Sequence, residues 1–524
     1  MFDKNNSGFL LKIFFITGIG LALQACNGEK SDSVTDVAVV DNATEIQWHK
    51  GNVDQAFTLA KQQNKPLYFY WGAEWCPPCQ EIKHTVFTHP KFITQSELFI
   101  PVYLDGDTEQ AQEVGERFAV FGYPTMIVFD ANGKEITRIP GGIDTRRYLD
   151  VLTLSLNQGQ RMDQLIAKAR ATPASLSADE LTQLAFYSWG QDNLQLGANE
   201  ALTLLKSLAF IDGANDQLAA SRLLLAYLAK SVDEDVDDLT PEEKNEVNTK
   251  LLNSLRRPDT VLANIDFLSF YPREIVQLLD LPEPQADNLM QTWSEAVDRQ
   301  RNSPLLSKAE RLGTWLAPIH FYWLQYPNAE QIPTALADDV TAMVADFNEN
   351  TQGDERQSVI NRAGNVLRAA NLYDQAKTLI SAELKISKSP YYFMSSLAEI
   401  AQETDKPTEV LEWRQKAYNA AEGRATRFQW GVEYVDALIQ HDPNNAQEIT
   451  KMSQAILQHV AASEVFSGRN LGRLQTLLDS MDQWQGEGRQ ETLTHFVGQL
   501  HNLCEQTSGE SPQRQQCAQL LAAL

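Results

Sequence analysis

The run Trp75-Cys76-Pro77-Pro78-Cys79 constrains the fold of this chain more than any other feature. The residues before it, 68–71, have the pattern of a buried strand, and those after it, 80–83, begin a helix. Two cysteines one turn apart at a helix start predict a redox couple, because the free N–H groups and the positive end of the helix dipole favour a thiolate on Cys76. Such a thiolate can attack a partner's disulfide, and Cys79 can then displace the partner.

A Cys-x-x-Cys pair by itself is also compatible with half a zinc site or with a structural disulfide. The sequence has no second cysteine pair and no histidine pair at ligand spacing, so we expect no metal. Gln80 stands where a c-type haem attachment motif has histidine, and there is no glycine-rich phosphate loop. We therefore expect no cofactor, and the structural disulfide stays open as the alternative.

The segments around the motif predict a small α/β domain. They are a helix over 52–63, a strand around 100–104, strands over 126–129 and 135–139 joined by the turn 130–133, and a last helix after Gly141-Gly142. Together with the strand at 68–71 and the helix that follows the motif, these elements complete the expected order β-α-β-α-β-β-α.

Residues 45–158 resemble a thioredoxin fold, and within it the periplasmic C-terminal domain of DsbD-type thiol:disulfide interchange proteins. The matching segments are the motif itself, Val86 to Pro90, Val102 to Asp105 and Phe121 to Thr125. The resemblance covers about a fifth of the chain, and its motifs are specific when taken together.

The resemblance implies roles for individual residues. Cys76 and Cys79 would be the catalytic redox disulfide, and Pro124 would follow a cis peptide bond that faces the sulfurs and a substrate strand. Trp75, Tyr123 and Thr125 would position the substrate.

The sequence also departs from the family. Tyr70 stands where thioredoxin has a buried aspartate, and Tyr103 aligns by counting with the lysine partner of that aspartate. Glu74 is near in sequence but at a surface position, and Gln80 replaces a common lysine. Because a buried carboxylate can relay the proton of the second thiol, Cys79 has no obvious base.

The N-terminus resembles a bacterial lipoprotein signal. Lys4 and Lys12 precede an apolar stretch over 13–23 that is too short to span a bilayer, and the run Leu23-Gln24-Ala25-Cys26 follows. The resemblance implies that residues 1–25 are removed, that Cys26 is lipidated and that residues 26–44 form a flexible tether. By resemblance to the enterobacterial lipoprotein sorting rule, Asn27 rather than aspartate after the cysteine implies the outer membrane. A plain secretory signal followed by an unrelated cysteine is the alternative.

The two remaining cysteines, Cys504 and Cys517, lie symmetrically about the turn over 508–512. Two adjacent antiparallel helices would bring them together, and we expect a structural disulfide. A second redox pair that exchanges with Cys76 is the alternative.

The rest of the chain is predicted to be all-α, with apolar residues at helical spacing and few strand signals. Ala376, Val410 and Ala446 lie in three helix starts spaced 34 and 36 residues apart, near the period of tetratricopeptide repeats. We expect a degenerate helical-hairpin array over 351–524. Residues 159–350 either extend this array or form a separate helical layer.

The formal net charge is -25, and loss of Asp3, Lys4 and Lys12 with the signal makes it -26. This charge argues against nucleic acid as a partner and leaves the lipid as the only membrane contact. The sequence thus favours a lipid-anchored oxidoreductase of the bacterial envelope that faces the periplasm and reduces protein disulfides. Its expected partners are disulfide-bearing or thiol-bearing periplasmic proteins. A membrane protein is a possible electron donor. The alternatives are a disulfide oxidase or isomerase, and a scaffold lipoprotein whose thioredoxin-like domain serves for docking.

Overall fold

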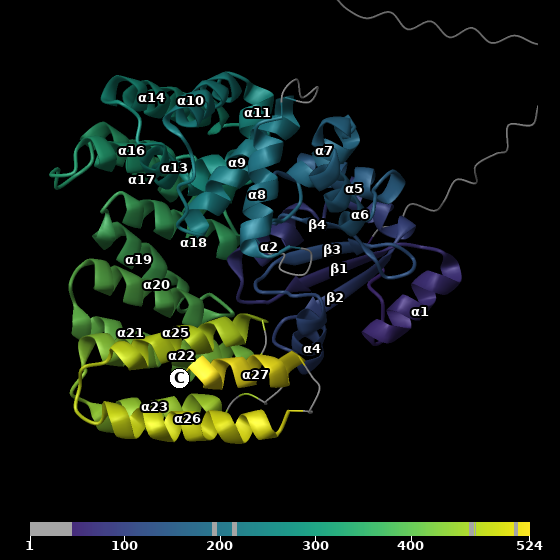
Figure 1. The fold of residues 1–524 in the computed structure, drawn as a ribbon. Helices are drawn as coiled ribbons and strands as arrows, with labels where there is room; N and C mark the ends of the chain where they lie inside the picture. Colours follow the sequence, from purple (N-terminus) through teal and green to yellow (C-terminus); the bar gives the residue numbers. More distant parts are fainter. Residues whose placement is uncertain are drawn as a thin grey trace, which may run out of the picture. The chain divides into compact units, whose positions relative to one another are not determined.

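The structure is a computed structural model that describes residues 45–190, 196–211, 217–458, 460, 466, 468–507 and 512–523 (Figure 1). Cys26, the expected signal and the whole of the expected tether lie outside these residues. The expected turn around residue 510 does so as well. No helix in the described part of the chain is both long and apolar enough to cross a membrane.

A mixed four-stranded sheet forms the α/β domain. Its strands are β1 (Leu67–Gly72), β2 (Ile100–Asp105), β3 (Thr125–Phe129) and β4 (Glu135–Ile139). Their spatial order is β2-β1-β3-β4, with β1 parallel to β2 and antiparallel to β3, and β3 antiparallel to β4. The predicted thioredoxin fold is therefore confirmed.

Six helical segments belong to this domain. They are α1 (Val53–Gln63), α2 (Pro77–Thr85), α3 (Pro90–Gln95), the 3₁₀ turn Ser96–Leu98, α4 (Glu109–Arg117) and α5 (Thr145–Asn157). The start of α1 is fixed by a capping box, in which Asn52 accepts from the Gln55 N–H and the Gln55 side chain accepts in return.

The two faces of the sheet are buried differently. Phe69, Trp71 and Ile127 pack with residues of α1 and α4 in a core of their own. Tyr68 and Val128, on the opposite face, belong to a larger apolar core that continues through the helices as far as Phe321. The α/β domain and the first half of the helical region therefore share one hydrophobic core.

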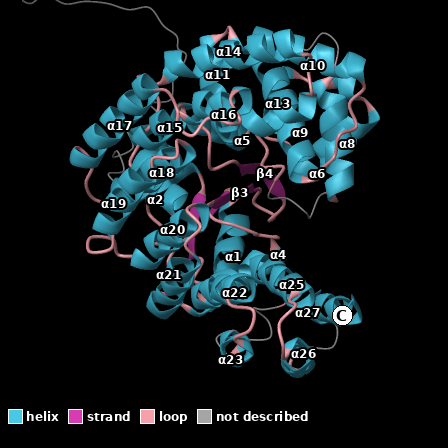
Figure 2. Cartoon of the chain, turned by 90° about the vertical axis from the view of Figure 1, so that its left-hand side faces the viewer, coloured by secondary structure: helices cyan, strands magenta, loops and turns pink. Residues whose placement is uncertain are grey.

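The remainder of the described chain is helical (Figure 2). Up to residue 350 its helices are α6 (Met162–Ala171), a 3₁₀ turn (Pro173–Ser175), α7 (Ala178–Ala185), α8 (Ala198–Ala209), α9 (Gln217–Asp233), α10 (Pro241–Leu255), α11 (Pro258–Ala263), α12 (Ile265–Phe270), α13 (Pro272–Leu279), α14 (Glu283–Gln300), α15 (Lys308–Gly313), α16 (Leu316–Gln325) and α17 (Thr334–Glu349). Beyond it they are α18 (Glu355–Ala369), α19 (Tyr373–Glu383), α20 (Pro390–Glu403), α21 (Pro407–Ala420), α22 (Arg424–His441), α23 (Ala446–Leu457), α25 (Gly468–Gln483), α26 (Arg489–Glu505) and α27 (Pro512–Ala523).

Consecutive helices from α18 to α23 pack against one another, as expected for an array of helical hairpins. The three helix starts read from the sequence are those of α19, α21 and α23. The α/β domain followed by a large all-α region is thus confirmed, while the assignment to tetratricopeptide repeats stays a prediction.

Candidate active site

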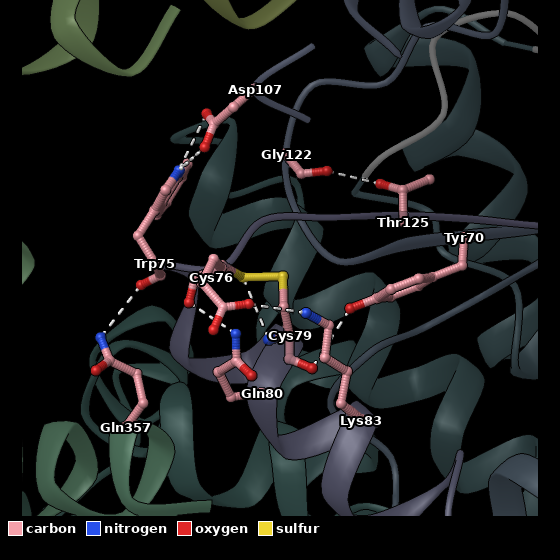
Figure 3. Close-up of a disulfide and its surroundings, with 11 residues drawn as sticks. Tyr70, Trp75, Cys76, Cys79, Gln80, Lys83, Asp107, Gly122, Thr125 and Gln357 are labelled. Carbon is pink, nitrogen blue, oxygen red and sulfur yellow. Dashed lines mark hydrogen bonds and ion pairs between the residues drawn. A yellow bond between two sulfur atoms is a disulfide. The ribbon is translucent and has the colours of Figure 1, made fainter. Parts of the chain in front are cut away.

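Cys76 and Cys79 form a disulfide at the start of α2 (Figure 3). Cys76 is the N-cap residue, and Pro77 and Pro78 occupy the first two helical positions. Because proline has no N–H, the first free backbone donor of the helix is that of Cys79, which donates to the Cys76 Sγ at 3.2 Å. The helix start therefore offers one N–H and its positive dipole end to a Cys76 thiolate.

Tyr70 and Tyr103 lie behind the second cysteine. They are register partners on β1 and β2, and their rings stack with centroids 5.5 Å apart. The Tyr70 hydroxyl donates to the backbone carbonyl of Cys79 at 3.4 Å (Figure 3). Tyr70 and Tyr103, which align by counting with the aspartate and lysine of thioredoxin, are therefore in contact. Two stacked phenol rings replace the carboxylate–lysine pair of that family.

Burial, followed by the neighbouring Tyr103, raises the pKa of Tyr70 well above its usual value of 10.0. A phenol with a raised pKa stays protonated at neutral pH, so Tyr70 can donate a hydrogen bond but cannot serve as a base for Cys79. Thioredoxin has a buried aspartate at this position, and this chain has Tyr70 there instead.

We expect Tyr70→Phe to leave the pH dependence of thiol–disulfide exchange unchanged between about pH 6 and 9, with rates within about twofold of wild type. The reason is that the substitution removes a neutral donor and no titrating group. Exchange rates of the reduced pair measured across this range, with Tyr103→Phe as the matched control, test the prediction. Loss of an apparent pKa in Tyr70→Phe alone would contradict it.

Glu74 lies at the surface, as expected, and is held there by cations. Its carboxylate contacts Lys83 at 3.3 Å and Lys388 of the helical region at 3.4 Å. Although burial acts to raise it, these two lysines lower the pKa of Glu74. Gln80 is buried and donates to the backbone carbonyl of Glu74 at 2.7 Å, so its side chain fixes the loop before the motif.

The Tyr123–Pro124 peptide bond is cis, as the resemblance implies. The Thr125 hydroxyl donates to the carbonyl of Gly122 at 2.8 Å and thereby closes the turn that carries Pro124. Gly141 approaches this turn so closely that a Cβ there would lie 2.8 Å from the Pro124 Cγ. Thr125 therefore shapes the turn that carries Pro124. Gly141, which follows β4, has to be a glycine because a side chain there would collide with Pro124.

Trp75 joins the motif to the helical region. Its Nε1 donates to the Asp107 carboxylate at 3.0 Å, and the Thr426 hydroxyl of α22 donates to the same carboxylate. The Trp75 ring stacks on Tyr392 of α20 with centroids 6.4 Å apart. The Arg469 guanidinium of α25 lies over the rings of Trp75 at 4.9 Å and Tyr123 at 5.5 Å.

The helical region consequently covers the redox pair. Cys76 and Cys79 are 2% and 0% exposed, and they share an apolar cluster with Tyr391, Ala417 and Trp430. Gln357 of α18 adds a hydrogen bond to the Trp75 carbonyl at 3.3 Å (Figure 3). We refer to helices α18, α20, α21, α22 and α25 as the helical cover.

Sequence reasoning missed every residue of the cover that contacts Trp75. Tyr392 and Arg469 are more than 300 residues from Trp75 along the chain, Gln357 is 282 residues away, and none of the three lies in a motif. Asp107, which follows β2, offered only the general signal of a carboxylate after a strand.

The other cysteines are also joined: Cys504 of α26 and Cys517 of α27 form a disulfide that closes a separation of 13 residues. Both are buried, in an apolar cluster distinct from the one that contains Cys76. Among the described residues there is no group of three metal-ligating side chains.

Comparison with known proteins agrees with this geometry. Residues 53–154 match the family model of the thioredoxin-like domain. The thiol:disulfide interchange protein DsbD of Photorhabdus laumondii is 30% identical over 100 residues, or 18% of this chain and 17% of the relative. The DsbD protein of Vibrio vulnificus is 29% identical over 124 residues, or 22% of this chain and 21% of the relative.

The solved structure of a DsbH oxidoreductase aligns with 25% of this chain and 96% of its own length, at 20% identity and a TM-score of 0.21. The matches to the two DsbD proteins span only about a fifth of their length. Residues 53–154 of the chain thus form a thioredoxin-like domain that resembles the periplasmic domains of DsbD-type proteins.

Proposed function

We propose that this protein is a thiol–disulfide oxidoreductase of the bacterial envelope that reduces disulfides in thiol- or disulfide-bearing partners. The observation that carries the proposal is the Cys76–Cys79 disulfide at the start of α2, with the Cys79 N–H on the Cys76 sulfur. Cys76 attacks the partner's disulfide, a mixed disulfide forms, and Cys79 resolves it. Pro124, Trp75 and Tyr123 present the backbone and ring surfaces that meet the partner.

The similarity to DsbD-type domains supports reduction, with a membrane electron donor that returns the pair to the dithiol state. The lipoprotein-like signal supports a lipid anchor at Cys26, a tether over 26–44 and the outer membrane. In this arrangement the helical region selects the partner, and the cover has to move before a folded protein reaches Cys76.

Trapping of mixed disulfides tests the proposal. In Cys79→Ala the resolving thiol is gone, so we expect disulfide-linked partners to accumulate on Cys76 and to be released by dithiothreitol. The matched control is the double variant Cys76→Ala, Cys79→Ala, which keeps the fold and lacks the attacking thiol. Recovery of no more partners from the single variant than from the double variant would overturn the proposal.

A second candidate function is a scaffold lipoprotein whose helical array binds partners. The observation that favours it is the burial of both active-site sulfurs under the helical cover. A chain carrying Cys76→Ser separates the two functions: full complementation of a deletion strain by this variant would show that the scaffold, and not the redox pair, is what the cell requires.

A further inference from the structure

Helix α2, which begins at the redox pair, is joined to the helical region through Ser307, the N-cap residue of α15. The Ser307 hydroxyl donates to the carboxylate of Glu81 on α2. The Ser307 N–H donates to the carboxylate of Glu310 on α15 at 2.6 Å, and the Glu310 N–H donates back to the Ser307 hydroxyl at 3.1 Å. One serine thus holds a carboxyl group of the α/β domain and one of the helical region at the interface between them.

The two carboxyl groups face a single guanidinium. Arg362 of α18, a helix of the helical cover, interacts electrostatically with both Glu81 and Glu310. All three side chains line a cavity of about 360 Å³ between α2, α15 and α18. Asp266 lines the same cavity, but its carboxylate is paired with the Arg222 guanidinium at 2.7 Å. The cluster of Glu81, Glu310 and Arg362 is therefore neutral when one of its two carboxyl groups carries a proton.

Neighbouring elements add further charges that face this cluster. They are Glu355 of α18, His84 of α2 and Asp144 at the N-terminus of α5. Glu355 is itself paired with Lys308 at 3.0 Å, and His84 is exposed, so that water screens its charge. The two additional carboxylates thus disfavour a second negative charge in the cluster.

The pKa of each carboxyl group follows from this arrangement. Burial at the interface raises the pKa of both half-buried residues, Glu81 and Glu310, and Glu81 raises that of Glu310 further, well above its usual value of 4.5. The hydrogen bonds from Ser307 act in the opposite direction but do not cancel this effect. If α2 and the helical region separate, water surrounds both groups and their pKa returns to about 4.3. The closed interface therefore binds a proton more tightly than the open one.

From this cluster we propose that Glu81, Glu310 and Arg362 form a pH-sensitive latch, which keeps the helical cover closed on α2 while the carboxyl pair holds one proton and releases the cover when that proton passes to water. The latch is strongest below the ordinary carboxyl pKa of about 4.3, and it weakens as the pH rises through the raised pKa of the closed pair. Regulation of access by pH goes beyond the proposed function and does not depend on the direction of electron flow through Cys76 and Cys79.

Labelling of Cys76 by a polyethylene glycol maleimide measures the opening, because Cys76 is 2% exposed when the cover is closed. The background is the full chain with Cys26→Ser and Cys79→Ala, in which Cys76 is the single free thiol and the Cys504–Cys517 disulfide stays oxidised. Each further variant is compared with this background at the same pH, from pH 5 to 8.5, so that the titration of the Cys76 thiol cancels in the ratio of the two rates.

Glu310→Gln mimics the protonated carboxyl group and keeps the capping box, since glutamine also serves at that position. The ratio of the background rate to the Glu310→Gln rate should rise by at least about threefold between pH 5 and 8.5, because loss of one proton shifts the opening equilibrium by up to about tenfold per pH unit. Glu243→Gln is the matched control. Glu243 has the same place in the capping box of α10 and pairs with Lys206 at 3.3 Å, so its ratio should stay constant with pH.

Two more variants test the sharing of one proton. Glu81→Gln should remove the pH dependence as Glu310→Gln does, and the double variant should add little, because either change leaves one carboxylate beside Arg362. Arg362→Met should act in the opposite direction and raise the labelling rate at pH 8.5 by at least about threefold, because two carboxylates then lose their cation. A merely structural role for these residues would not produce opposite effects of this kind.

A ratio for Glu310→Gln that does not change with pH would overturn the latch, and so would faster labelling of both glutamine variants than of the background at pH 8.5. If Glu310→Gln does not fold, as judged by circular dichroism, Glu81→Gln carries the same test. The proposed function is tested separately by the trapping of partners on Cys76 at a single pH. Trapped partners together with a constant ratio would defeat the latch alone.

Discussion

Asp107→Ala and Tyr392→Ala should each raise the rate at which reduced Cys76 reacts with a bulky maleimide by about tenfold or more. Asp107 accepts hydrogen bonds from Trp75 and from Thr426 of the helical cover, and Tyr392 stacks on Trp75. Removing about 1.4 kcal/mol of such contacts shifts an opening equilibrium tenfold. The rate should rise because Cys76 is reached only when the cover is displaced.

The comparison needs a control for general destabilisation. Asp150→Ala removes a surface carboxylate that pairs with Lys91 at 3.1 Å, far in sequence from the cover contacts, and should leave the labelling rate unchanged. Labelling of the dithiothreitol-reduced protein with a polyethylene glycol maleimide, followed by gel shift, gives the rate. Because Asp107 and Tyr392 both contact Trp75, the double variant should show a coupled effect that is not the sum of the two.

Two results would contradict a closed cover. The first is a wild-type labelling rate equal to that of the urea-unfolded chain. The second is an unchanged rate in both variants, which would mean that Trp75 and its partners do not hold the cover in place.

The local features of the site followed from the sequence because they depend on neighbours along the chain. The position of Cys76 at a helix start is set by the strand before it and by two prolines after it. Tyr70 and Tyr103 could be paired by counting because β1 and β2 are parallel and adjacent, so their registers are fixed by the fold.

The helical cover could not be predicted in the same way. Its contacts join Trp75 to Gln357, Tyr392 and Arg469, across 282 residues in the first case. Tyrosine, glutamine and arginine at helical positions are ordinary surface residues unless the path of the chain is known.

The second large effect concerns the two disulfides, which should differ widely in reduction potential. Cys76–Cys79 closes a separation of three residues, and Cys504–Cys517 one of 13. Loop closure stabilises a longer loop more, so the second bond has the character of a structural disulfide. At the first bond, the Cys79 N–H and the dipole of α2 stabilise the reduced thiolate, which makes the bond easier to reduce.

Equilibrium titration of the full chain in glutathione and dithiothreitol buffers measures both potentials. The variant Cys504→Ser, Cys517→Ser isolates the active-site pair, and Cys76→Ser, Cys79→Ser isolates the other. We predict that Cys76–Cys79 titrates as a two-electron couple between about -270 and -180 mV, the range from thioredoxin to protein disulfide isomerase, and that Cys504–Cys517 lies below about -300 mV. A potential below about -300 mV for Cys76–Cys79 would show a structural disulfide and would contradict the assignment of this pair as the redox centre.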